Sequence, residues 1–227
     1  MLEEERLMFE GWAKLPQFKK KVEKSTQVIK ESLNIGDAYV ACSWGKDSVV
    51  LTHICQQVKQ DISVISFGHP ERIMISNYEE VERIYCEQFA PNLTTVMIEG
   101  DHVPLKVNKA RLWEIYPVAF IGLRKEESVK RRQSLCKNGL IYQTKSHGWR
   151  ACPLADWHTN DVWAYTVNHK LPYLKAYDLG ALRTTDHVSK SLRKDYQSTR
   201  IEELRKTAPQ YYQYLQNQYP EMFYATN

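Results

Sequence analysis

The sequence predicts an α/β protein with a doubly wound, mostly parallel sheet, helices on both faces and a helical C-terminal extension. Short apolar segments of strand length alternate with helical segments, an order that is typical of parallel sheets. The 227 residues suffice for one such domain and would crowd two. Neither an internal repeat nor a linker rich in Pro, Gly or Ser divides the sequence, so we expect a single hydrophobic core.

The predicted elements follow one another in a regular order. A helical spacing of apolar residues from Phe18 to Leu33 places a helix before the first strand. Short apolar runs then predict four strands, at residues 38–42, 62–67, 93–98 and 118–122. Helical segments at residues 50–58 and 78–89 separate the first three strands. Because strands joined by helical crossovers run parallel, the central sheet should be parallel.

The last third of the sequence has a weaker periodic pattern. One clear helix spans residues 159–168, and two further helical stretches occupy residues 198–206 and 210–218. We therefore expect N-terminal helices in residues 1–36, a ligand-binding α/β region in residues 37–180, and a helical extension of the same domain in residues 181–227.

The composition excludes several classes of protein. The apolar fraction of 43% and the charged fraction of 26% indicate a soluble globular protein rather than a disordered or fibrous one. The net charge of +4 favours phosphate-bearing ligands but falls short of a duplex-binding protein, so a nucleic-acid partner is only weakly supported. The sequence lacks a run of about 18 apolar residues and starts with acidic residues, which predicts a cytoplasmic protein without a membrane segment.

The cysteine and histidine residues do not have the spacing of a metal site. The five cysteines are widely separated and include no CxxC pair, so we expect reduced thiols, without a disulfide framework or a zinc ribbon. The histidines also lack metal-ligand spacing, and the sequence therefore predicts no protein-bound metal.

The loop after the first predicted strand has the composition of an anion site. It reads Ser-Trp-Gly-Lys-Asp-Ser over residues 43–48 and leads into a helix, whose N-terminus favours negative charge. Gly45 allows the backbone to approach a phosphate, and Lys46 supplies a point charge. The hydroxyls of Ser43 and Ser48 can donate to phosphate oxygens, while Asp47 can orient the loop or bind Mg²⁺ through phosphate. The loop does not match the Walker pattern GxxxxGK[ST].

A basic cluster follows the fourth predicted strand. From Gly122 to Arg132 the sequence has five basic and two acidic residues, a local charge of 5 − 2 = +3. Arg124, Ser128 and Arg131 or Arg132 have helical spacings of three or four, so we expect their side chains to converge on one polyanion. The alternative is an ordinary solvated helix face.

A third segment, residues 152–178, contains the predicted helix 159–168. Thr159 or Asn160 can cap this helix at its N-terminus. Asp156 precedes the helix and is a candidate site residue, since a carboxylate there can hold a basic side chain or a metal.

These three motifs resemble those of one superfamily. The loop 43–48 resembles the SGGKDS signature of the PP-loop ATP pyrophosphatases, or adenine nucleotide alpha hydrolases, with Trp44 where the second residue is usually Gly. Residues 122–128 resemble the GLRxxES segment of the phosphoadenosine phosphosulfate (PAPS) reductase family, and residues 152–178 are similar to that family's P-L-x-x-W-x-x-x-D-V-W-x-Y … L-P-Y-x-x-x-Y-D segment. We expect the Trp44 side chain to restrict the backbone and its indole to narrow the phosphate pocket.

The resemblance implies a PP-loop nucleotide-binding domain over residues 37–180. Its ligand would be ATP, PAPS or adenosine phosphosulfate (APS), with Mg²⁺ expected beside ATP. The phosphates would lie between residues 43–48 and 124–132, the adenine would lie near residues 65–67, including Phe67, and the catalytic residues would be Lys46, Asp47 and Arg124. His69 stands where the family often has Asp-Thr-Gly; it would contact phosphate or act as an acid or base, unless it faces solvent.

One feature of the reductases in this family is not found. They use a catalytic cysteine in a C-terminal E-C-G-x-H motif, and no cysteine follows Cys152 here. We therefore doubt a thioredoxin-dependent reductase activity. Cys136 and Cys152 are the candidate thiols that remain, since Cys42 and Cys55 have the pattern of core residues. The paired cysteines of an iron–sulfur cluster are also not seen, so no cluster is predicted.

The leading hypothesis is an enzyme that acts at the phosphate or sulfate group of an adenine nucleotide, by adenylyl transfer with release of pyrophosphate or by sulfuryl transfer. One alternative is a nucleotide sensor without turnover. Another is an enzyme that adenylates a nucleic acid before sulfur transfer, which would need a basic face beyond the pocket. The acceptor and any partner protein remain unassigned, and a homodimer is left open.

Overall fold

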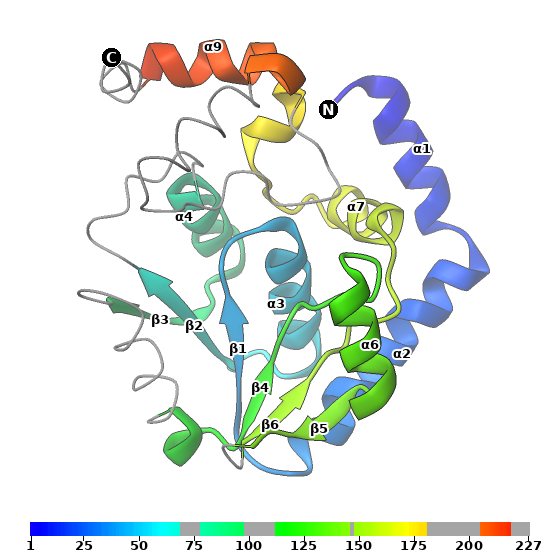
Figure 1. The fold of residues 1–227 in the computed structure, drawn as a ribbon, viewed down its shortest axis with the longest axis vertical. Helices are drawn as coiled ribbons and strands as arrows, with labels where there is room; N and C mark the ends of the chain where they lie inside the picture. Colours follow the sequence, from blue (N-terminus) through cyan, green and yellow to red (C-terminus); the bar gives the residue numbers. More distant parts are fainter. Residues whose placement is uncertain (69–77, 98–111, 146–147, 181–204, 219–227) are drawn as a thin grey trace.

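The computed structural model describes residues 1–68, 78–97, 112–145, 148–180 and 205–218, and the chain folds around one six-stranded sheet (Figure 1). His69, Ile98 and most of the predicted helix 198–206 lie outside the described residues. The strand order is β3-β2-β1-β4-β6-β5. The strands are β1 (Ala38–Cys42), β2 (Ser63–Gly68), β3 (Asn92–Met97), β4 (Val118–Phe120), β5 (Ile141–Gln143) and β6 (Trp149–Ala151).

All strands except β5 run parallel to their neighbours. In the centre of the sheet, Val40 of β1 pairs with Val64 of β2 on one side and with Phe120 of β4 on the other. β3 and β6 extend the parallel sheet, and β5 is antiparallel to β6 at the edge. The predicted sheet is confirmed. β5 and β6 were not predicted, because each has only three residues, one of them polar, and neither belongs to a longer apolar run as β4 does.

The helices confirm the predicted α/β alternation. In chain order they are α1 (Glu3–Ala13), α2 (Pro16–Leu33), α3 (Lys46–Val58), α4 (Tyr78–Phe89), α6 (Val129–Asn138), α7 (Thr159–Asn168), the 3-10 helix η1 (Lys175–Leu179) and α9 (Pro209–Gln218). α4 and α7 have the ends that the sequence predicted. α3 begins earlier than the apolar pattern suggested, because its first turn consists of the polar loop residues.

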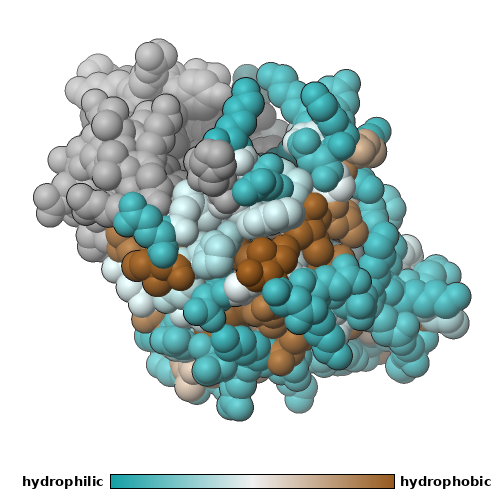
Figure 2. All heavy atoms as spheres, turned by 90° about the horizontal axis from the view of Figure 1, so that it is seen from below, coloured by the Kyte–Doolittle hydropathy of each residue, from teal (hydrophilic) through white to brown (hydrophobic). Residues whose placement is uncertain are grey.

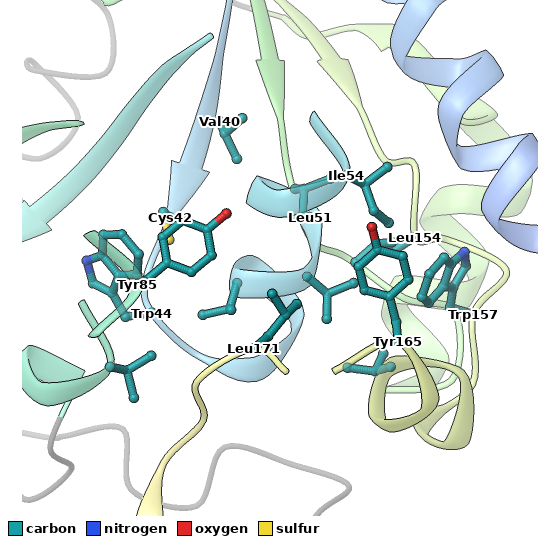
Figure 3. Close-up of a cluster of buried hydrophobic side chains, with 14 of the residues drawn as sticks. Val40, Cys42, Trp44, Leu51, Ile54, Tyr85, Leu154, Trp157, Tyr165 and Leu171 are labelled. Carbon is teal, nitrogen blue, oxygen red and sulfur yellow. The ribbon is translucent and has the colours of Figure 1, made fainter. Parts of the chain in front are cut away.

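Successive side chains of each strand point to opposite faces of the sheet. Val40 and Cys42 face the main core, together with Leu51 and Ile54 of α3 and with α7 (Figure 3). Tyr39 of β1 belongs to a second cluster with Ile65 and Ala119, against which residues of the segment 112–116 pack. A third cluster joins Leu135 of α6 to Cys152 and Ala155, just after β6. The sheet is thus covered on both faces.

The N-terminal helices pack on α7 and on the loop before it. The indole Nε1 of Trp12 in α1 donates to Asp161 Oδ1 at 3.0 Å. In α2, the buried Ser25 hydroxyl donates to the carbonyl of Pro153 at 2.7 Å and accepts from Trp157 Nε1 at 2.8 Å. These hydrogen bonds join α1 and α2 to residues more than a hundred positions later in the chain.

The face of the molecule seen from below is largely covered by hydrophilic side chains (Figure 2). Figure 2 shows the molecule from below, where hydrophobic side chains gather in a patch near the middle of the view. Two exposed hydrophobic side chains, Ile35 and Ile115, precede β1 and β4 at the amino-terminal edge of the sheet. Within the described residues, no helix combines the length and the apolar character needed to cross a membrane.

Candidate active site

The carboxyl ends of parallel strands meet at one edge of a sheet, and loops that follow them can form a common site. Here β1, β4 and β6 end at Cys42, Phe120 and Ala151. The segments that follow them, residues 43–45, 121–128 and 152–158, carry all three motifs that the sequence singled out. The fold therefore brings these motifs to the same edge.

The loop after β1 is held by its own serine side chains. The Ser48 hydroxyl donates to the carbonyl of Gly45 at 2.9 Å and accepts from the backbone N–H of Ser43 at 3.2 Å. The two hydroxyls of Ser43 and Ser48 lie 3.4 Å apart. This hydroxyl, which we expect to donate to phosphate, thus also shapes the loop. Gly45, the residue before α3, has no side chain with which to cap the helix.

Trp44 adopts the left-handed backbone conformation that glycine, the usual residue at this position of the signature, adopts more easily. Its φ is 59°, and its side chain is only 3% exposed. The indole packs on Tyr85 of α4, with ring centroids 5.6 Å apart, next to Cys42 in the core (Figure 3). The expectation that the indole narrows the phosphate pocket is wrong, because the left-handed backbone turns this side chain into the core. Trp44 belongs to the loop through its backbone.

Lys46, Asp47 and Arg124 form a compact group of charges. Asp47 accepts from Lys46 Nζ at 2.9 Å and from Arg124 Nε at 2.6 Å. The Arg124 side chain is fully buried, and Lys46 is only 4% exposed. Buried cations persist only with carboxylate or other anionic partners. Asp47 is the carboxylate partner of both Lys46 and Arg124. The three residues that we predicted to be catalytic are thus in direct contact.

Gly122 allows the segment after β4 to approach the start of α3. A Cβ atom at this position would lie 3.3 Å from the carbonyl oxygen of Asp47 and 3.5 Å from the backbone nitrogen of Ser48. Contacts as short as 3.3 Å would require the neighbouring backbone to move. Glycine at position 122 therefore keeps Arg124 close enough to reach Asp47.

Arg124 and Arg131 do not converge on one point as the spacing suggested. α6 begins at Val129, so Arg124 precedes the helix. The Arg131 guanidinium pairs with Glu127 instead. The Ser128 hydroxyl accepts from the backbone N–H of Arg131 at 3.2 Å and thereby caps α6. The prediction failed because a charge run conceals where a helix begins.

Asp156 holds basic side chains, one of the two roles that the sequence left open for it. Its carboxylate accepts from Lys125 Nζ and from Lys24 Nζ, both at 2.6 Å. Burial raises the pKa of Asp156, but these hydrogen bonds outweigh burial and hold the pKa below its usual value. Asp156 therefore links α2 to the segment after β4.

The sequence reading missed two residues that touch the charge group. Glu126 Oε2 accepts from Arg124 Nη1 at 2.6 Å and from the backbone N–H of Thr159 at 2.7 Å. The ring of Tyr177, in η1, lies with its centroid 6.0 Å from Lys46 Nζ. In the sequence, Glu126 stands out only as one of two negative charges within a basic run. The sequence signal for Tyr177 was its place in the L-P-Y-x-x-x-Y-D match.

The cysteines are mostly buried thiols. Burial raises the pKa of Cys42 to about 11 and that of Cys152 to about 12, and it places the pKa of Cys55 well above its usual value. Cys152 is therefore wrong as a candidate nucleophile, because it is fully buried and its thiol stays protonated. Cys136 on α6 is exposed.

Phe67 of β2 packs on the second core cluster with Tyr39 and Ile65.

The described residues do not form a cage for a metal ion. Within the described parts of the chain, no group of three or more His, Cys, Asp and Glu side chains is placed to hold one. The carboxylate of Asp47 is occupied by Lys46 and Arg124. A divalent cation at this edge would therefore need ligand phosphates for most of its coordination.

Comparison with known proteins identifies the family. Residues 37–220, well over half of the chain, match the phosphoadenosine phosphosulfate reductase domain. The chain belongs to the PAPS reductase domain family. An adenosine 5'-phosphosulfate reductase of Bacillus cereus (strain ZK / E33L) is 28% identical over 167 residues, which cover 64% of this chain and 69% of that protein. The corresponding protein of Geobacillus thermodenitrificans (strain NG80-2) has the same identity and coverage.

Two solved structures share the fold of this chain. A phosphoadenylyl-sulfate reductase from Candida auris, in a phosphate complex, has a TM-score of 0.53 at 16% identity and covers 84% of this chain and 98% of that one. The FMN adenylyltransferase of Candida glabrata, with FAD and inorganic pyrophosphate, has a TM-score of 0.59 at 13% identity, covering 78% of this chain and 68% of that one. The predicted PP-loop fold is confirmed.

Proposed function

We propose that this protein is an enzyme that binds an adenine nucleotide, with its phosphates at the N-terminus of α3, and acts at the phosphate or sulfate group. One observation carries the proposal: two buried cations, Lys46 and Arg124, flank Asp47 at a helix start that Gly45 leaves without a side-chain cap. The first N–H groups of a helix have no partner within the helix and attract anions. A phosphate there would accept from these N–H groups and from the cations.

The family and its relatives support an adenine nucleotide as the ligand. The curated relatives are named adenosine 5'-phosphosulfate reductases. Among the solved structures of the same fold, one is a reductase in a phosphate complex and another holds FAD and pyrophosphate. We expect ATP, APS and PAPS to compete for one pocket, because all three combine adenosine with a charged phosphate chain.

The residues of the site would work by positioning and by electrostatic stabilisation. With ATP, Lys46 and Arg124 would hold the leaving pyrophosphate while an acceptor attacks the α-phosphorus, and Mg²⁺ carried by the phosphates would neutralise further charge. With APS or PAPS, the same cations would bind the phosphosulfate while the sulfuryl group passes to an acceptor. Asp47 would keep both cations in place before the ligand arrives.

A reductase reaction that relies on Cys42, Cys55 or Cys152 is not favoured. Cys42, Cys55 and Cys152 are buried with raised pKa values, and a buried neutral thiol is a poor nucleophile. We expect no thioredoxin-dependent release of sulfite from PAPS or APS. Release of sulfite that one cysteine substitution abolishes would contradict this and would identify the nucleophile.

Calorimetric titration of ATP, APS and PAPS tests the proposal. Lys46→Ala should weaken binding by about 1.5–3 kcal/mol, the cost of losing a charged hydrogen bond. Lys137→Ala is the matched control, since Lys137 is exposed near the end of α6, and its loss should leave the affinity unchanged. Equal affinities of wild type and Lys46→Ala for all three nucleotides, with unchanged thermal stability, would contradict the assignment.

Turnover separates an enzyme from a nucleotide sensor. The sensor hypothesis takes Trp44, the departure from the family's signature, as one mark of abandoned catalysis, but its indole lies in the core beside Tyr85. Incubation with labelled ATP or APS should yield pyrophosphate or a transferred sulfuryl group once an acceptor is supplied. Tight binding without product for any acceptor, including water and small thiols, would favour a sensor.

A polyanionic acceptor is favoured by α6. This exposed helix carries Lys130, Arg131 and Arg132 in its first turn and no acidic residue, so its N-terminal end is basic beyond the charge group. Binding of single-stranded RNA or DNA should then weaken as salt rises and should weaken further in a Lys130→Ala, Arg132→Ala variant. Binding unaffected by both changes would exclude this candidate.

A further inference from the structure

We propose that Glu126 is a positioning residue: it fixes the guanidinium of Arg124 so that the free Nη2 atom meets the bound anion. The inference rests on the proposed function and deepens it, because it explains how one buried arginine is aimed. Glu126 lies between Arg124 and the first residue of α7 and contacts both.

Two of the three guanidinium nitrogens of Arg124 already have carboxylate partners. Nε donates to Asp47 Oδ1 at 2.6 Å and Nη1 donates to Glu126 Oε2 at 2.6 Å. Nη2 is buried, and among the described residues it has no hydrogen-bond partner. A buried donor without a partner is uncommon in folded proteins and needs an explanation. A ligand oxygen at this edge of the sheet would supply the acceptor.

Both carboxylates are needed to orient the group. A guanidinium is planar, and a contact at Nε alone leaves it free to swing about that point. The second contact, at Nη1, fixes the plane and therefore the direction of Nη2. Asp47 also holds Lys46, so its carboxylate is shared. Among the described residues, Glu126 contacts Arg124 but not Lys46, and its other oxygen lies 3.4 Å from His158 Nδ1. Glu126 can therefore hold Arg124 while Asp47 adjusts to a ligand.

Glu126 is itself anchored to a rigid element. Its Oε2 accepts from the backbone N–H of Thr159 at 2.7 Å and from the Thr159 hydroxyl at 2.9 Å. Thr159 is the first residue of α7, whose Val162 and Trp163 are fully buried in the core. The orientation of the Arg124 guanidinium therefore depends on the position of α7.

The electrostatics of Glu126 agree with this role. Burial raises its pKa, but the hydrogen bonds from Thr159 and Arg124 outweigh burial and hold the pKa below the usual value. The side chain is 38% exposed, so it is kept in place by these hydrogen bonds rather than by packing.

The neighbouring Glu127 provides a matched control. Its Oε2 accepts from the backbone N–H of Arg124 at 2.8 Å, and its other oxygen pairs with Arg131. It carries the same charge as Glu126 in the next position but does not touch the guanidinium. A general effect of removing one negative charge from this segment would appear equally in Glu126→Gln and Glu127→Gln.

The test is a double-mutant cycle in nucleotide binding, with ATP and APS as probes. We expect Glu126→Gln to weaken binding by about tenfold and Glu127→Gln by less than about threefold. In an Arg124→Lys background, Glu126→Gln should have almost no further effect, because a lysine has no plane to orient. A purely structural role would lower the melting temperature and weaken binding in both backgrounds alike.

The outcomes separate this inference from the proposed function. If wild type binds nucleotide and Arg124→Lys weakens binding, but Glu126→Gln does not or acts additively, the positioning role is wrong and the proposed function stands. If wild type binds no adenine nucleotide, both fail. Should Glu126→Gln fail to fold, Thr159→Val removes one donor to Glu126, together with the hydroxyl that lies 3.5 Å from Arg124 Nη1. It should still weaken binding, but only in the Arg124 background, and an unchanged affinity would overturn the inference.

Discussion

α3 and α7 both begin at the carboxyl edge of the sheet, and their N-termini are treated in opposite ways. At α7 the protein supplies the anions: Glu126 accepts from the N–H of Thr159, and Asp161 Oδ2 accepts from the N–H of His158 at 2.7 Å. At α3 the preceding residue is Gly45, which offers no cap. One helix start is therefore satisfied by the protein's own carboxylates, while the other is the one that we propose for the ligand.

The charges around the two helix starts differ in the same sense. Asp161 is buried and also accepts from Lys21 and from the Trp12 indole, so the start of α7 anchors the N-terminal helices. The start of α3 is flanked by the buried cations Lys46 and Arg124. This comparison indicates that the position of a helix N-terminus does not by itself define a binding site. The contacts that its first turn already makes decide whether its N–H groups can bind a ligand.

The largest expected effect comes from opening the start of α7. Asp161→Ala removes the acceptor for Lys21, Trp12 and the N–H of His158, and it should lower the free energy of unfolding by about 3 kcal/mol. Urea unfolding measures this. Glu87→Ala is the control, because its ion pair with Arg83 is exposed and should be worth at most about 1 kcal/mol. Equal effects of the two variants would show that α7 is not an anchor.

Closing the start of α3 should abolish most ligand binding without harming the fold. Gly45 has φ −71°, and a Cβ there would meet only the Ser43 hydroxyl, at 3.7 Å, so a side chain fits. Gly45→Asp places a carboxylate at the first-turn N–H groups and should weaken nucleotide binding by about 2 kcal/mol. Its free energy of unfolding should change by only a few tenths of a kcal/mol.

Gly45→Ala separates charge from size at this position. It adds a Cβ but no carboxylate, so calorimetry should show affinity near that of wild type. A loss in Gly45→Ala as large as in Gly45→Asp would mean that the loop needs glycine for its backbone and would not support competition between a side-chain carboxylate and phosphate.

The smallest expected effect concerns the contact between the two helices. His53 of α3 and the hydroxyl of Tyr165 of α7 are 2.9 Å apart, and His169 stacks on Tyr165. Burial lowers the pKa of His53 to about 4 from 6.5 and lowers that of His169. Between about pH 6.5 and pH 4 the unfolded chain therefore binds more protons, so stability falls as the pH falls through this window.

Unfolding curves at several pH values measure this slope. His53→Asn should flatten it, because the substituted side chain does not titrate. An unchanged slope in His53→Asn would assign the pH dependence to other groups.

The sequence predicted the strands and helices with strong apolar patterns. β1, α4 and α7 have the predicted ends, because buried residues recur there at the period of a strand or a helix. It also brought Lys46, Asp47 and Arg124 together correctly. Their order along the chain placed them after strands whose carboxyl ends meet at one edge.

The details of the site depended on backbone geometry that the sequence does not display. The direction of the Trp44 indole follows from φ at one residue. The role of Glu126 follows from the closeness of α7, which is distant in sequence. Arg124 was assigned to a helix because its spacing to Arg131 fits one, although Ser128, a good N-cap residue, marks the later start.

The close approach of Gly122 to Asp47 has a consequence for folding. The contacts that complete the charge group, such as Arg124 to Asp47, join residues 77 positions apart. They require β4 to have paired with β1, and pairings between distant segments close long loops at a cost in chain entropy. A partly folded chain with only its first two strands in place therefore has the α3 loop but lacks Arg124. Titration with nucleotide would count only molecules whose central strands are fully assembled, which makes ligand binding a direct measure of the native fraction.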